Sequence, residues 1–184
     1  MKNILIVFLL AFFQSTTAQS TFEYDVVLTP VSVSGLPGLH SYAFAQHNGK
    51  WLIIGGRKDG LHARQPFNAF PGAQNNTDMY VVDIATQQSW LASVNSLPTG
   101  IKEQLQSTNM NFYQDGDALL IIGGYAYSTT AADHKTFNNL TSVDVPNLIN
   151  AIVAGTPITS YFKQISNDVF AITGGQLGKI GNTF

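Results

Sequence analysis

The segment KWLIIGGR at residues 50–57 decides the fold, because it returns as ALLIIGGY at residues 118–125. Each copy is an apolar run that ends in a glycine pair. Each also follows a tight-turn signal, Asn48-Gly49 or Asp115-Gly116, with another apolar run in front of it. Such pairs favour two-residue hairpin turns, because the central residues of those turns need positive φ. The sequence therefore predicts the same β-hairpin twice, 68 positions apart.

After the first glycine pair the sequence predicts two more strands. Residues 57–77 are polar and irregular, Met79–Asp83 is apolar and strand-like, and a further strand-like run carries Trp90. Short apolar runs bounded by Gly, Asn, Asp and Pro are typical of antiparallel β structure. The first unit is therefore expected to contain four antiparallel strands.

In the second unit the sequence predicts the same order of strands, with one insertion. Residues 125–139 are again irregular, LTSVDV at 140–145 takes the place of the third strand, and residues 158–165 that of the fourth. Between the last two lies PNLINAIVAG, which begins at Pro146 and ends at Gly155. Proline in a first turn and glycine just past the end predict a short helix here.

A four-stranded unit that recurs with a fixed period is typical of a β-propeller. The first unit also has a double glycine, then an aromatic residue before an aspartate, then a tryptophan: Gly55, Gly56, Tyr80, Asp83 and Trp90. In this pattern the chain resembles the Kelch-repeat family, and in detail a group of its secreted bacterial members. The second unit is a degenerate copy that keeps Gly123, Gly124 and Asp144 but neither the Tyr nor the Trp. The resemblance implies an all-β, Kelch-type β-propeller.

We interpret these motif residues as architecture. Glycines at the end of a second strand allow backbone geometry that a Cβ forbids and let neighbouring blades approach closely. Tyr80 and Trp90 are expected to pack between blades.

The spacing places a third unit at the end of the sequence. Gly174-Gly175 follows Gly123 by only 51 residues, whereas aligning GNTF at 181–184 with the earlier turns gives a period of 65. The glycine pair at 174 is therefore expected in or before an innermost strand. The chain is expected to hold about two blades plus part of a third, an incomplete ring, as the front part of a longer protein.

The expected division of the chain follows from these units. Residues 1–18 form a signal peptide and 19–184 a partial propeller, with a lead-in strand (19–38), blade one (39–108), blade two (109–168) and the start of blade three (169–184). The lead-in strand, Tyr24–Val33, either completes the last blade of a closed ring or packs on the edge of blade one.

Composition sets the compartment and limits the partners. Lys2 and the apolar run Ile4–Phe13, followed by small residues, predict a cleaved signal peptide and a secreted, cell-surface or periplasmic protein without membrane insertion after cleavage. The chain has no cysteine, so it holds neither disulfides nor Cys-ligated metals. Its net charge of −2, without a basic stripe, argues against nucleic acid.

The candidate ligand-binding residues lie in the two long loops that follow the glycine pairs. In the Kelch layout these loops emerge on the usual binding face, and loops that carry arginine and aromatic residues on a rigid scaffold are typical recognition sites. The candidates are Arg57, His62, Arg64, Tyr125, Tyr127 and His134. Phe67 and Phe70 are more simply read as anchors of the first loop. The pair His62 and His134 lacks ligand spacing, so we predict neither a metal site nor a cofactor.

The sequence therefore favours a secreted Kelch propeller that acts as a binding module for a carbohydrate or protein ligand on the long-loop face. The alternative is a propeller enzyme, similar to galactose oxidases or to sialic-acid isomerases, with catalytic residues in further blades. No catalytic motif is present in the sequence. The copper oxidases also depend on a tyrosine cross-linked to a cysteine, which this chain lacks.

Overall fold

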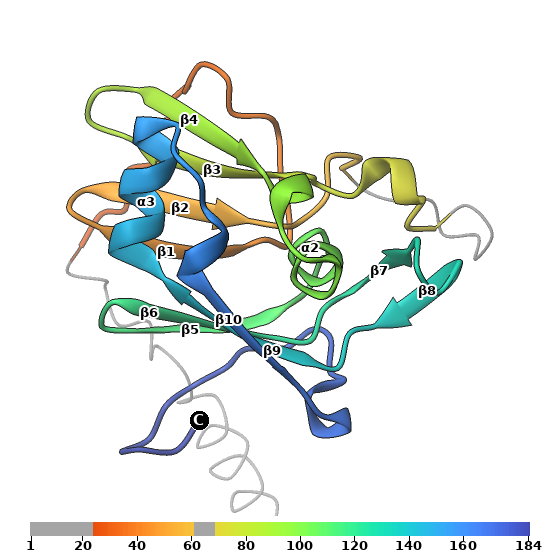
Figure 1. The fold of residues 1–184 in the computed structure, drawn as a ribbon. Coiled ribbons are helices and arrows are strands. Elements are labelled where there is room, and N and C mark those ends of the chain that lie inside the picture. The colour runs from red at the N-terminus through yellow and green to blue at the C-terminus, as the bar shows by residue number, and fades with distance from the viewer. Residues whose placement is uncertain (1–23, 61–68) are drawn as a thin grey trace, which may run out of the picture. The chain divides into compact units, whose positions relative to one another are not determined.

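The computed structural model describes residues 24–60 and 69–184, of which residues from Val31 onward form one compact unit (Figure 1). The expected signal peptide lies outside the described residues. The structure is mostly β and consists of antiparallel sheets, as the sequence predicted. Among the described residues no helix has the length and apolar character needed to span a membrane.

The first four-stranded sheet has the simple order β1-β2-β3-β4. Its strands are β1 (Ala43–His47), β2 (Lys50–Ile54), β3 (Asp78–Asp83) and β4 (Gln88–Ser93). The predicted turn between β1 and β2 is confirmed, because Asn48 and Gly49 have φ of 47° and 74°. A 3-10 helix, η2 (Gly72–Gln74), precedes β3.

The second sheet repeats this order around two insertions. Its strands, in the order β10-β9-β6-β5, are β5 (Asn111–Asp115), β6 (Ala118–Ile122), β9 (Asn139–Asp144) and β10 (Phe162–Ser166). A separate hairpin, β7 (Tyr125–Ser128) and β8 (Asp133–Thr136), is inserted after β6. Helix α3 (Val145–Ala154) is inserted after β9 and confirms the predicted helix. It ends at Gly155, whose φ of 65° is the left-handed cap expected of glycine.

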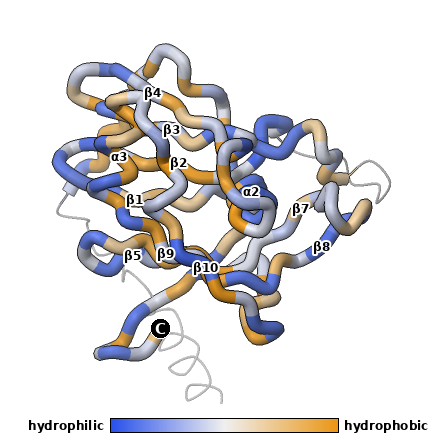
Figure 2. The backbone as a smooth tube through the Cα atoms, viewed as in Figure 1, coloured by the Kyte–Doolittle hydropathy of each residue, from blue (hydrophilic) through white to orange (hydrophobic). Residues whose placement is uncertain are grey.

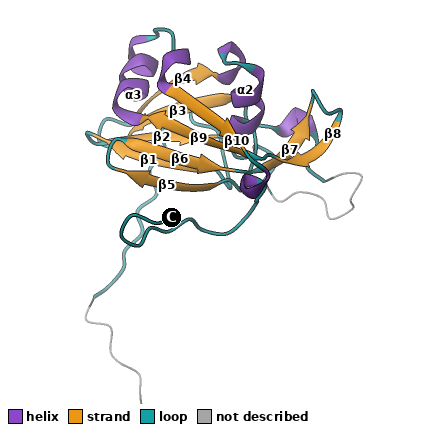
Figure 3. Cartoon of the chain, turned by 60° about the horizontal axis from the view of Figure 1, so that its bottom comes forward, coloured by secondary structure: helices purple, strands orange, loops and turns teal. Residues whose placement is uncertain are grey.

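The main core lies between the two sheets. Alternate residues of the first sheet, such as Leu52, Met79 and Val81, face Leu119 and Val143 of the second. Helix α3 packs on this face of the first sheet (Figures 1 and 3). Figure 2 shows the apolar residues along the strands of the first sheet and α3. The sheets are joined by η3 (Val94–Ser96) and by α2 (Thr99–Leu105), which sequence patterns did not indicate.

The opposite face of the first sheet has its own small core. Ile53, Tyr80 and Val82 are covered by side chains from the chain before β1, namely Val33, Leu36, Leu39 and Tyr42. Successive side chains of a strand point to opposite faces. Tyr80 therefore points away from the second sheet, and its packing between blades stays a prediction. Trp90 packs on the main core.

The glycine pairs join each unit to the next through repeated contacts. Gly56 N–H donates to Ser107 O at 2.9 Å, and Gly124 N–H donates to Ile172 O at the same distance. A Cβ on Gly55 would lie 2.6 Å from Ser107 O, and one on Gly123 would overlap Ile172 O. The predicted reason for glycine, close approach at positive φ, is confirmed at both junctions.

Contacts at the end of the chain repeat earlier ones 65 positions further along. Asn109 N–H donates to Ser41 O, and Gly174 N–H repeats this bond to Asn109 O. The bridge between Ile180 and Thr183 then repeats the turn pairing of the earlier hairpins. No strand follows in residues 169–184, which contain only η5 (Asp168–Phe170) at their start, so the strand expected here is not formed in the described chain.

Three further strand predictions need correction. Tyr24–Val33 forms no strand, because none of the described strands pairs with it. The fourth strand of the second unit starts at Phe162 rather than at residue 158, since η4 (Thr159–Tyr161) occupies its first turn. Residues 125–139 are not irregular throughout, because they contain β7 and β8.

Candidate functional site

The residues that follow the two glycine pairs occupy equivalent places. Arg57 forms a backbone bridge with His40, and Tyr125 forms the corresponding bridge with Thr108. Both lie at the end of the sheets opposite the hairpin turns, where the long loops begin. We call this end the loop face. The sequence-predicted residues of the described loops converge here.

Arg57 is buried, with 1% of its surface exposed. Its Nε and Nη2 donate to the two carboxylate oxygens of Asp59 at 2.9 and 2.7 Å, and Nη2 also donates to Pro71 O at 3.3 Å. The guanidinium carbon lies 5.1 Å from the centre of the Phe70 ring. The hydrogen bonds from Arg57 hold the pKa of Asp59 below its usual value. Arg57 therefore organises the first loop rather than presenting itself to solvent.

Among the residues that the structure describes, three buried polar atoms around Arg57 have no hydrogen-bond partner: His40 Nε2, Arg57 Nη1 and Asn75 Oδ1. Both His40 and Asn75 pair with Arg57 through backbone bridges. Residues paired in this way project their side chains to one face. Native proteins contain few unsatisfied buried polar atoms, and such atoms call for an explanation such as a bound water or ion.

Four side chains from both loops form an aromatic cluster, defined here as Phe70, Tyr125, Tyr127 and His134. The Phe70 and Tyr125 rings meet edge to face at 5.2 Å, and Tyr125 stacks on His134 at 5.8 Å. His134 Nε2 donates to Phe70 O at 2.8 Å. The cluster connects the first loop to the β7–β8 hairpin. Each of its members is partly exposed.

A buried carboxylate anchors that hairpin from α2. Glu103 accepts hydrogen bonds from the Ser128, Thr129 and Thr130 hydroxyls and from Thr130 N–H, at 2.7–2.9 Å. Burial by itself would raise the pKa of Glu103, but these hydrogen bonds outweigh it and lower the pKa to about 2. No sequence signal pointed to Glu103, because its partners lie 25–27 residues away.

The predicted residues therefore divide into three groups. Tyr125, Tyr127 and His134 come together, with Phe70 as the loop anchor that the sequence suggested. Arg57 lies behind them. His62, Arg64 and Phe67 fall outside the described residues. Among the residues that are described, no group of three or more His, Cys, Asp or Glu side chains could hold a metal.

The two motif aspartates are local caps. Asp83 ends β3 and accepts from Thr86 N–H at 3.1 Å, and Asp144 ends β9 and accepts from Asn147 N–H at 3.3 Å. The hydrogen bond from Thr86 N–H, with help from Lys50, keeps the pKa of Asp83 below its usual value. This shared role, a carboxylate that accepts from the N–H three residues later, explains the aspartate in each unit.

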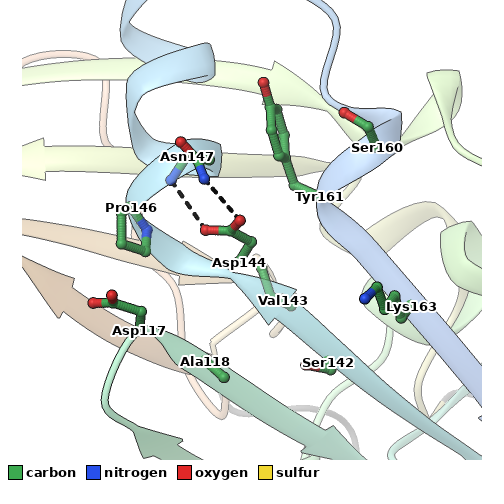
Figure 4. Close-up of a pocket in the computed structure, with 10 residues that line it drawn as sticks. All are labelled: Asp117, Ala118, Ser142, Val143, Asp144, Pro146, Asn147, Ser160, Tyr161 and Lys163. Carbon is green, nitrogen blue, oxygen red and sulfur yellow. Dashed lines mark hydrogen bonds between the residues drawn. The ribbon is translucent and has the colours of Figure 1, made fainter.

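A pocket of about 390 Å³ lies at the opposite end of the second sheet, beside the start of α3 (Figure 4). Asp117, Ser142 and Asp144 line one part of it, and Tyr161 and Lys163 another. The sequence analysis interpreted Asp144 as a motif residue and did not single out Lys163. We call it the α3 pocket.

In comparisons with known proteins, no family model matches the chain and no curated protein is significantly similar to it.

Proposed function

We propose that this chain is the front part of a secreted Kelch-type β-propeller that acts as a binding module at the loop face, for a carbohydrate or protein ligand. The signal-peptide pattern of residues 1–18 supports export. The low net charge without a basic stripe supports a ligand other than nucleic acid.

The propeller is supported by contacts that repeat between units. The glycine junction between the first and second sheets recurs between the second sheet and residues 170–174, at a spacing 65 residues further along. A repeat that forms the same junction on both sides adds units by the same rotation each time. In a propeller this rotation closes a ring of four-stranded blades.

Binding at the loop face is supported by one observation above all, the aromatic cluster. Side chains from two successive loops meet there and stay partly exposed, on a frame fixed by Arg57 and Glu103. Tyrosine rings held in this way offer contact area at low entropic cost and are common in binding surfaces. The burial of Arg57 assigns it a supporting role, so Tyr125, Tyr127 and His134 are the proposed contact residues.

The test is binding of the full-length protein to a glycan array and, in parallel, to an array of secreted and surface proteins. Tyr125→Ala and His134→Ala are expected to weaken the bound ligand by about tenfold or more, because each removes a ring from the cluster. Tyr113→Ala is the matched control, since Tyr113 lies in β5 against Phe184 and away from the loops. Thermal unfolding of each variant shows that it is folded. A ligand whose affinity neither loop variant changes would contradict the assignment.

A further inference from the structure

Three residues stand side by side where the first loop begins. Arg57 pairs through its backbone with His40 on one side and with Asn75 on the other. Residues that pair directly place their side chains on one face, with Cβ atoms about 5 Å apart. The Asn75 side chain continues toward the second unit, because its Nδ2 donates to Tyr127 O at 3.2 Å. The three side chains therefore lie between the first loop and β7.

Each of these side chains has one buried polar atom without a hydrogen-bond partner among the described residues. We call the three atoms, Arg57 Nη1, Asn75 Oδ1 and His40 Nε2, the buried trio. Arg57 and Asn75 are 1% and 7% exposed. The two units that the structure describes already bury the trio, so its burial does not depend on any further repeat. Buried polar atoms are costly to leave unpaired, which makes a shared partner the expected arrangement.

The neighbouring side chains do not supply that partner. The nearest carboxylate oxygen to His40 Nε2 is that of Asp59 at 3.7 Å, which is too long for a hydrogen bond. Both oxygens of this carboxylate already accept from Arg57. Turning the amide of Asn75 would place its oxygen against Tyr127 O and lose the bond to it. Gaps of this length between polar groups are typically bridged by water.

The chemistry of the trio selects the kind of partner. Arg57 Nη1 only donates and Asn75 Oδ1 only accepts, whereas His40 Nε2 can do either. Asn75 Oδ1 and the Asp59 carboxylate would repel an anion, and the guanidinium would repel a cation. The partner must therefore be a neutral molecule that both donates and accepts. Buried waters typically make about three hydrogen bonds to groups of this kind.

We propose that the buried trio binds one ordered water, which accepts from Arg57 Nη1 and donates to Asn75 Oδ1 and His40 Nε2. The imidazole then carries its proton on Nδ1 and donates to Ser41 Oγ at 3.1 Å. Because Asn75 also holds Tyr127 O, the water connects His40 to β7 and makes His40 a positioning residue for the loop face. This inference requires no ligand, so it stands or fails separately from the proposed binding at the loop face.

The first test is a crystal structure of the full-length protein at a resolution that shows ordered water. One fully occupied water is expected within about 3.2 Å of all three atoms of the trio. The proposal is overturned if no density lies there, if the density is that of an ion, or if the three atoms pair with protein groups instead.

The second test is a matched pair of variants at His40. Glutamine carries an amide about where Nε2 lies, whereas asparagine reaches only about as far as Nδ1. His40→Gln should keep the water and leave amide hydrogen exchange at Arg57, whose N–H donates to His40 O at 3.1 Å, as it is. His40→Asn should lose the water and speed this exchange by about three- to tenfold, which corresponds to one hydrogen bond.

The controls separate the lost water from general destabilisation. His47→Asn, at the other end of β1, should leave exchange at Arg57 unchanged. Thermal unfolding shows that each variant is folded, and if His40→Asn does not fold, the crystal structure of the unchanged protein decides. Equal exchange rates at Arg57 in His40→Gln and His40→Asn would overturn the role assigned to Nε2.

Discussion

The loops after the two glycine pairs start from equivalent positions and are fixed by opposite charges. The first is held by a buried cation, because Arg57 ties Asp59 and Pro71 together. The second is held by a buried anion, because Glu103 gathers the hydroxyls at the tip of the β7–β8 hairpin. At the position equivalent to Arg57 the second loop has Tyr125, which stays partly exposed. Both units therefore share the glycine junction, whereas each loop is fixed by a different charged side chain.

This difference shows where a repeat tolerates change. The glycine junctions join sheet to sheet and permit no Cβ, so both copies keep them. The anchors Arg57 and Glu103 make their side-chain hydrogen bonds to loop residues and not to the junction glycines, so the anchors can differ in charge and in origin. Substitutions in the shared junction are therefore expected to cost more unfolding free energy than substitutions in the individual anchors.

The largest effects are expected from alanine at the junction glycines, beginning with Gly55→Ala. Gly55 has φ of 69°, and a Cβ there would lie 2.6 Å from Ser107 O and also overlap Met110. The backbone strain alone costs about 1–2 kcal/mol, and the overlap should raise the loss of unfolding free energy to about 3 kcal/mol or more. Urea denaturation measures it.

The comparison of junctions sharpens this prediction. Gly123→Ala should cost at least as much as Gly55→Ala, because its Cβ would overlap the backbone carbonyl of Ile172, which accepts a hydrogen bond from Gly124 N–H. Gly49→Ala is the control for strain alone, since its φ is 74° with no atom within 4 Å of the added Cβ. Equal losses at Gly49 and Gly55 would show that the junction is not tightly packed.

The second-largest loss of stability is expected from Glu103, the buried anion that holds the second loop. The pKa of Glu103 is about 2 in the folded protein, against an ordinary value of 4.5. A lowered folded pKa gives stability that is complete above the unfolded value and is lost as the pH falls through the folded one. Glu103 should therefore contribute about 3 kcal/mol at neutral pH, lost between about pH 5 and pH 2.

Glu103→Gln is the decisive variant. It keeps the shape and one acceptor oxygen, so the protein should fold with lower stability and a flatter pH dependence in this window. Asp117→Asn, on an exposed carboxylate, is the control and should leave the acid transition in place. Chemical denaturation at a series of pH values gives both curves. An unchanged slope in Glu103→Gln would show that other groups govern acid stability.

The third-largest loss of stability is expected from replacing Arg57, the buried cation of the first loop. Arg57→Met fills part of the same volume but removes both hydrogen bonds from Arg57 to the Asp59 carboxylate. Because the Asp59 side chain is 16% exposed, the loss should be about 2 kcal/mol, below that of a fully buried pair. Tyr125→Met at the equivalent position removes a partly exposed ring and should cost about 1 kcal/mol. The reverse order, measured by thermal unfolding, would contradict the assignment of Arg57 as the anchor.

The local parts of this structure were predictable from sequence. The hairpin at Asn48-Gly49 and the helix from Pro146 to Gly155 carry their signals in adjacent residues, and both are confirmed. Strand Tyr24–Val33 has strand composition but no partner, and pairing is not a local property. The β7–β8 hairpin was missed because its anchor, Glu103, lies on another element.

The same limit applies to the candidate site. The expectation that Tyr125 and His134 share a face came from the loop layout that the Kelch resemblance implies. The burial of Arg57 did not, since it depends on how residues 59 and 71 fold back over it. The pocket at Lys163 was hidden for another reason. Recognising Lys163 as the counterpart of Trp90 requires the strand register, which the sequence leaves open around an inserted helix.

The smallest losses of stability are expected at the two aspartate caps, Asp144 and Asp83, and they should differ. Asp144→Ala removes the acceptor for Asn147 N–H at the start of α3 and should cost about 1 kcal/mol. Asp83→Ala removes the same bond from a tight turn that is exposed and supports no helix, so its cost should be smaller. Because α3 packs across the first sheet, the loss of its cap should also speed amide hydrogen exchange at Leu148 and Ile149. Exchange that stays unchanged in Asp144→Ala would mean that packing alone holds the helix, and the aspartate of the second unit would then be a relic of the repeat.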